Sequence, residues 1–171
     1  THVGLNAGFA TMYYFERADT TFNSGDGSLN IYHKITPRLT IANKSYLTYA
    51  IEPDLAIGVA VPRRLSHYWY GHNNSSLTYA LNRRTTSITR FGLNGITYED
   101  EISSAVNDKM KYEISQEMRY VLNVVSDLVG EYRYVGADYD LADYDYGAHY
   151  LLAGLNHSFN LMLRGTLMAG A

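Results

Sequence analysis

The chain lacks cysteine and is poor in proline and tryptophan, with three prolines and one tryptophan in 171 residues. The absence of cysteine excludes disulfides, zinc-thiolate sites and thiol nucleophiles. No run of about eighteen apolar residues occurs, which excludes a transmembrane helix. The formal net charge of −3 argues against a nucleic-acid partner, because such a partner requires a basic surface.

Tyrosine is the residue type in excess, with 17 copies against 5 phenylalanines. Its amphipathic ring suits the membrane-water interface, where aromatic belts form. The mean hydropathy of −0.23 is typical of a soluble protein. A membrane β-barrel also has a low mean value, because only alternate residues contact lipid. A solvated, tyrosine-rich sheet is the other explanation of this composition.

Apolar side chains recur at every second position through most of the chain, which is typical of β-strands. This alternation predicts nine strands. Eight lie at 1–16, 29–36, 39–51, 67–81, 85–98, 109–122, 146–157 and 161–169, and another lies between the turn at 124–126 and the loop at 136–145, where residues 131–134 alternate. The connections between them alternate in length. Short turns are expected at 36–38, 82–84, 124–126 and 158–160, and long loops at 17–28, 52–66, 99–108 and 136–145. Short turns on one rim and long loops on the other predict an all-β fold, an antiparallel up-and-down transmembrane β-barrel forming a single domain over 1–171.

One segment also fits a helix. Met110, Ile114, Met118 and Val121 recur at three- and four-residue spacing, and Gly130 is a residue type that ends helices. A helix between about residues 107 and 130 therefore stays open as an alternative to two strands.

Several segments carry a family resemblance: Pro37-Arg38-Leu39, Glu52-Pro53-Asp54, Asn94-Gly95-Ile96, Glu131-Tyr132-Arg133-Tyr134 and the segment 153–160. Through them the chain resembles the porin-like β-barrels of the bacterial outer membrane, a large and mostly uncharacterised family. The resemblance implies a location in the bacterial outer membrane, contact with its lipid and lipopolysaccharide, passive passage of small solutes, and no cofactor. Envelope proteins or other copies of the chain are the further partners that it implies.

The expected strand number is odd, whereas single-chain bacterial barrels close with an even number. The sequence shows no amino-terminal signal peptide, and it ends in 167–171 without the terminal aromatic that such barrels commonly carry. We therefore expect the chain to be part of a larger barrel, or to close with strands of another copy.

The strand positions that alternate with the apolar ones carry charges of both signs. These residues are predicted to line the lumen: Lys34, Lys44, Arg90, Lys111, Glu113, Glu117, Arg119, Glu131, Arg133 and Arg164. In a water-filled lumen they would give weak ion selectivity. The alternative is that they pair with one another and plug the barrel. Near the third short turn we expect Glu117 or Arg119 to pair with Glu131 or Arg133.

Six histidines and an acidic loop suggest other chemistry. Ser66-His67, Asp54, His149 and His157 are of the residue types that hydrolase sites use, but no G-x-S-x-G or H-E-x-x-H motif accompanies them. We therefore expect no catalytic residue. The loop 138–145 has four aspartates but not the glycine or the closing glutamate of an EF-hand, so we expect a solvated loop and no metal site.

Two other functional classes stay open. A soluble lipocalin-like ligand carrier has a similar length and strand number. Lipocalins place Gly-x-Trp on the first strand, whereas Trp69 stands on the fourth predicted strand. The second class is a structural or anchoring outer-membrane barrel with a plugged lumen.

Overall fold

The computed structural model describes residues 1–13, 21–51, 66–100, 104, 108–140, 145–160 and 162–171. Across these residues the chain forms nine strands: β1 (His2–Tyr13), β2 (Thr21–Lys34), β3 (Leu39–Ile51), β4 (His67–Ala80), β5 (Thr85–Tyr98), β6 (Lys109–Asn123), β7 (Ser126–Tyr139), β8 (Tyr146–Ser158) and β9 (Arg164–Gly170). The predicted all-β class is confirmed. In the part described, no helix is long and apolar enough to cross a membrane.

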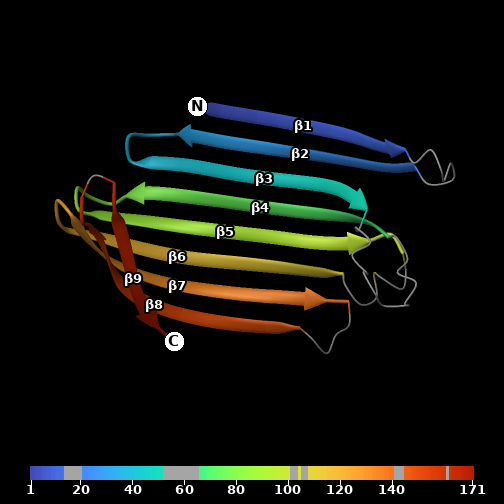
Figure 1. Cartoon of the computed structure of the whole chain (residues 1–171). Helices are drawn as coiled ribbons and strands as arrows, with labels where there is room; N and C mark the ends of the chain where they lie inside the picture. The colour runs from blue at the N-terminus through green and yellow to red at the C-terminus, as the bar shows by residue number, and fades with distance from the viewer. Residues whose placement is uncertain (14–20, 52–65, 101–103, 105–107, 141–144, 161) are drawn as a thin grey trace.

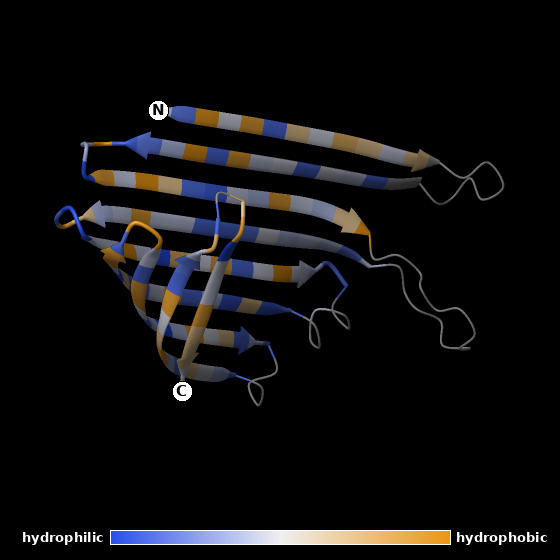
Figure 2. Cartoon of the chain, turned by 60° about the vertical axis from the view of Figure 1, so that its left-hand side comes forward, coloured by the Kyte–Doolittle hydropathy of each residue, from blue (hydrophilic) through white to orange (hydrophobic). Residues whose placement is uncertain are grey.

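The strands form one up-and-down antiparallel sheet in chain order, with each strand hydrogen-bonded to the next. Figure 1 shows the short turns together at one end of the sheet. The sheet bends over from β6 to β9 and so has a concave side (Figures 1 and 2). It is not a closed barrel: β1 and β9 each have one neighbouring strand among the described residues.

Three predicted boundaries are wrong. β2 begins at Thr21, so residues 21–28 of the predicted loop 17–28 are strand, although they include Gly25 and Gly27. β7 runs from Ser126 to Tyr139, so residues 136–139 of the predicted loop 136–145 are strand, and β9 begins at Arg164. Pairing with a long neighbour explains the first two cases, because ladder hydrogen bonds outweigh the low strand propensity of glycine.

The helical alternative for 107–130 is also wrong, because β6 and β7 pair with each other over nearly their full length. The helical spacing of Met110, Ile114 and Met118 coincides with every fourth residue of a strand, which lies on one face. Pairing of β6 with β5 on its other side fixes the extended backbone.

Each short turn is stabilised by the same kind of side-chain hydrogen bond. Thr36, Asn82, Asn123 and Asn160 each accept hydrogen bonds from backbone N–H groups two or three residues ahead, at distances of 2.8 to 3.2 Å. Asparagine and threonine side chains stabilise tight turns in this way. The predicted positions of the first two turns, 36–38 and 82–84, are confirmed. The third turn is 124–125, one residue shorter than predicted, and the fourth begins after Ser158.

The register gives the sheet two chemically different faces, and the alternation is visible along the strands in Figure 2. One, the apolar face, carries Leu5, Ile41, Leu77, Ile114 and Leu167. The other, the ionic face, carries all ten charged residues predicted for the lumen. Pairing partners directly opposite each other lie on the same face, so the two faces continue from β1 to β9.

Large apolar side chains of this sheet are exposed and two of its charged side chains are buried, the reverse of a soluble protein. Leu151 and Leu167 on the apolar face are 70% and 79% exposed. Glu117 and Glu131 on the ionic face are 4% and 5% exposed. The ionic face is therefore the concave side of the sheet where it bends, and the apolar face is the convex side.

Candidate functional site: the ionic face

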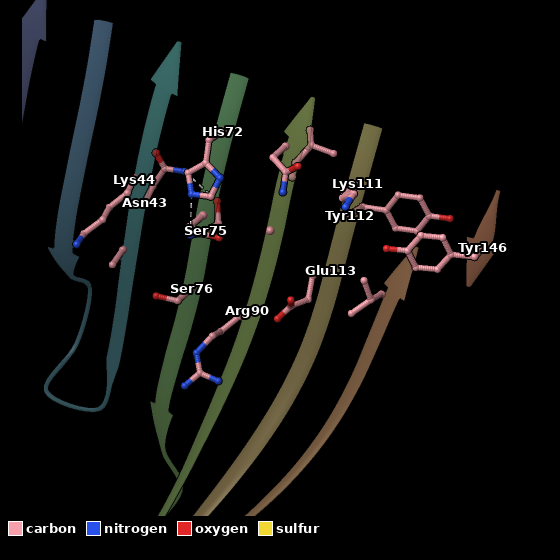
Figure 3. A pocket seen from close by; sticks show the side chains of 16 residues that line it. Asn43, Lys44, His72, Ser75, Ser76, Arg90, Lys111, Tyr112, Glu113 and Tyr146 are labelled. Carbon is pink, nitrogen blue, oxygen red and sulfur yellow. Dashed lines mark hydrogen bonds between the residues drawn. The ribbon is translucent and has the colours of Figure 1, made fainter. Parts of the chain in front are cut away.

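A hollow of about 650 Å³ lies on the ionic face between β3 and β8. Its charged lining consists of Lys44 on β3, Arg90 on β5, and Lys111 and Glu113 on β6 (Figure 3). His72 on β4 also lines it and lies 3.0 Å from the amide nitrogen of Asn74. The hollow therefore brings together four of the ten predicted lumen residues.

Glycine keeps the middle of this hollow open. In the register, Gly92 lies between Asn74 on β4 and Glu113 on β6. A Cβ at position 92 would lie 3.2 Å from the side-chain oxygen of Asn74, which is closer than ordinary van der Waals contact. Any larger residue would therefore project into the hollow between these two side chains.

An ion-pair network occupies the bent part of the same face. Glu117 accepts hydrogen bonds from Arg119 and, at 2.7 Å, from Arg90. Arg133 binds Glu131 at 2.8 Å and lies 3.7 Å from Glu113. We call these six residues the ion-pair network. It compensates each of its two buried carboxylates with at least one guanidinium group, as charges out of contact with water require.

The cross-strand pairs predicted near the third short turn are wrong. Glu117 lies directly opposite Glu131, and Arg133 lies opposite Ser115. Two carboxylates facing each other need nearby cations. Each glutamate obtains one from the same strand two residues later, Arg119 or Arg133. The repeated Glu-x-Arg pattern in both strands was the available sequence signal.

The remaining predicted lumen residues lie apart. Arg164 on β9 pairs with Asp127 on β7 at 2.8 Å, an aspartate that sequence analysis did not single out. Lys34 stands at the end of β2, exposed and outside the hollow. Together with the hollow and the network, these positions account for the whole predicted set.

Ser115 lies beside the ion-pair network but has no partner of its own among the described residues. It is 1% exposed, lies between Arg90 and Arg133 in the register, and its hydroxyl has no hydrogen-bond partner within the described part of the chain. A buried hydroxyl without a partner destabilises a fold, so the side chain contributes little that alanine would not.

The apolar face contains a polar cluster that sequence analysis treated as irregularities. Asn43 donates to Ser75 at 2.9 Å, Ser75 to Asn73 at 3.1 Å, Asn73 to Ser45 at 2.8 Å, and Ser45 to Asn43 at 2.8 Å. We call these four residues the polar ring. The four hydrogen bonds form a closed circle, which leaves one N–H of each amide unused by the ring. Two Asn-x-Ser segments on paired strands were its sequence signal.

Aromatic side chains of the apolar face lie at two levels. Toward the long connections, Tyr49 contacts Trp69 with ring centroids 4.8 Å apart, and Tyr112 contacts Tyr134 at 5.9 Å. Toward the short turns stand Tyr79 and Tyr120, both 42% exposed. Other tyrosines, such as Tyr70, lie on the ionic face, so the many tyrosines of the chain are divided between the two faces.

The components considered for catalysis or metal binding are dispersed. His149 contacts the Tyr132 hydroxyl at 2.8 Å, and His157 contacts the Ser126 hydroxyl at 2.9 Å without a carboxylate bound to its ring in the described chain. Asp54 lies outside the described residues. No group of three histidines or acidic residues in the described ranges is placed to hold a metal ion. Part of the loop 138–145 is not described; Asp145 accepts the N–H of Tyr139 at 2.7 Å.

No family model, no curated protein and no solved structure matches the chain.

Proposed function

We propose that this chain forms the wall of a bacterial outer-membrane β-barrel, a porin-like passive channel for small solutes. The observation that carries the proposal is the inverted burial of the sheet. Glu117 and Glu131 are buried on the concave face, while large apolar side chains such as Leu151 and Leu167 are exposed on the convex face. An apolar convex face is stabilised by contact with lipid acyl chains rather than with water. The ionic face is compatible with the water-filled lumen of such a barrel.

The spacing of the aromatic levels supports a membrane-spanning wall. Trp69 and Tyr79 lie on one strand, ten residues apart. That spacing is about 33 Å along a strand at the usual rise. With the tilt of about 40° found in outer-membrane barrels, it corresponds to about 25 Å across the membrane, the height of their apolar band.

The same burial argues against a soluble lipocalin-like carrier. Such a carrier binds apolar ligands in an interior lined by apolar side chains, with its charges in bulk solvent. Here the concave side carries the ionic residues. The single tryptophan also stands on β4 rather than on the first strand.

A plugged, anchoring barrel is the second candidate, and the ion-pair network favours it. Glu117 is paired with two arginines. Such paired charges stabilise the barrel wall, and less net charge remains to interact with passing solutes. Flux of small ions through vesicles carrying the protein separates the candidates: a channel raises the flux, and an anchor leaves it at the level of empty vesicles.

The proposed barrel needs further strands. In hydrocarbon an unpaired strand edge leaves N–H and C=O groups without partners, at several kcal/mol each. Within the described chain, β1 and β9 each have one free edge. We propose that strands from elsewhere in the same protein, or from another copy, pair with them.

The single tryptophan provides the test. Trp69 is 46% exposed on the apolar face. With the protein reconstituted in vesicles, lipids brominated on their acyl chains are expected to quench its fluorescence strongly. In the matched variant W69F/Y70W the fluorophore moves one residue along β4 and onto the ionic face. That variant is expected to be quenched weakly by the brominated lipid and more by aqueous iodide. Equal lipid quenching of both proteins, or none of either, would contradict the proposed orientation.

A further inference from the structure

The hollow on the ionic face has more positive than negative charge. Three cations, Lys44, Arg90 and Lys111, line it against one carboxylate, Glu113. That carboxylate already has Arg133 at 3.7 Å, from outside the lining. Glu113 therefore leaves most of the positive charge in the hollow uncompensated.

The two lysines differ from the arginines in their partners. Arg90 is bound to Glu117, but Lys44 and Lys111 make no ion pair with any residue in the described ranges. A lysine ammonium is a strongly hydrated point charge on a flexible stem, so it can move over the hollow to meet an anion. Lys44 and Lys111 stand three strands apart and are offset by two residues along the strands, which corresponds to roughly 16 Å between their backbones.

The floor between the lysines is polar and open. Asn74, Ser76 and Asn94 line it, and their amide and hydroxyl groups can donate hydrogen bonds to oxygen atoms of a ligand. Gly92 lies in the middle and adds no side chain. A group of several atoms therefore has room to lie on the sheet between the cations.

We propose that this hollow is a binding site for small organic anions, with oxygens of a carboxylate or phosphate group held between Lys44 and Lys111 over Gly92. The proposal rests on the proposed lumen, of which it names the solute class. Bound anions of this kind would pass the barrel in preference to cations and neutral solutes of the same size.

Direct binding tests the site whether or not the protein conducts. Succinate and inorganic phosphate are titrated separately into the protein in detergent micelles and followed by calorimetry, which also shows which anion class is preferred. We expect K44Q/K111Q to weaken binding by roughly tenfold or more, the equivalent of losing a hydrogen bond to a charged group. Gly92→Ala should weaken binding with no change in charge.

The matched control is R83Q/R84Q, which also removes two positive charges but in the exposed turn between β4 and β5. It should bind both anions as the unmodified protein does. The inference is overturned if the unmodified protein binds neither succinate nor phosphate, or if K44Q/K111Q binds them as tightly as R83Q/R84Q.

Planar-bilayer currents in a salt gradient then separate this inference from the proposed function. Anion preference that falls in K44Q/K111Q and persists in R83Q/R84Q supports both. Conductance with the same ion preference in all three proteins contradicts the site and leaves the channel standing. Calorimetric binding without conductance contradicts the channel and leaves the site standing.

Discussion

The two halves of the ionic face treat charge differently. In the bent half, Glu117 and Glu131 are buried and each is bonded to arginine. In the hollow, Lys44 and Lys111 have no carboxylate partner in the described ranges, and open space lies between them. Compensated charges stabilise the wall, whereas uncompensated charges remain available to a ligand. In the proposed barrel, the bent half would therefore brace the wall, and the hollow would stay open to solutes.

The largest effect is expected from Glu117→Gln. The substitution keeps the size of the side chain but leaves Arg90 and Arg119 without their shared carboxylate. We expect a loss of about 2 to 3 kcal/mol in the free energy of unfolding, below the full range for a buried pair because both arginines are 36% exposed. Urea unfolding in detergent micelles, followed by Trp69 fluorescence, measures it.

The control for this experiment is Glu113→Gln. Glu113 is 43% exposed and lies 3.7 Å from Arg133, so its loss should amount to less than about 1 kcal/mol. Equal losses in the two variants would show that burial and close pairing of a carboxylate do not decide how much it contributes to stability.

The polar ring on the apolar face consists of uncharged side chains that are hydrogen-bonded to one another. Asn73→Leu removes a donor to Ser45 and an acceptor for Ser75. We expect a loss of about 1 to 3 kcal/mol, because the partners are left unpaired on an apolar face. The combined variant N43L/S45A/N73L/S75A removes every unpaired group and should regain most of that stability in vesicles. A combined variant less stable than Asn73→Leu would contradict the closed ring.

The lysines of the hollow should matter little to stability. Neither Lys44→Gln nor Lys111→Gln breaks an ion pair found in the described chain, so each should change the free energy of unfolding by no more than about 0.5 kcal/mol. The urea titration used for Glu117→Gln measures this as well. A loss comparable to that of Glu117→Gln would place both lysines in the stabilising half and remove the distinction.

The smallest effect is expected at Ser115, two residues from Glu117 on the same strand and face. Ser115→Ala removes a buried hydroxyl that has no partner in the described residues. The free energy of unfolding should stay the same or rise by up to about 1 kcal/mol. A clear loss in the same titration would mean that this hydroxyl is bonded in solution and belongs to the network.

The sequence was most informative where a repeating pattern is local. Alternation gave the parity of Lys44, Glu117 and Leu167, and a single residue such as Asn82 marked a turn. Where the pattern had two explanations, as for Met110 to Val121, sequence alone left them open. Pairing on both sides of β6 decided the case. The orientation of the two faces toward lipid and water is a prediction that the quenching of Trp69 tests.

The amino-acid sequence by itself predicted strands over most of the chain, the alternation of short and long connections, and which side chains within one strand share a face, because strand periodicity depends only on position along the chain. Tertiary structure alone decided the partners: Glu117 opposite Glu131, Asn43 beside Ser75, and Gly92 between Asn74 and Glu113. These depend on strand register, which is fixed by interactions across the whole sheet and by the lengths of its turns.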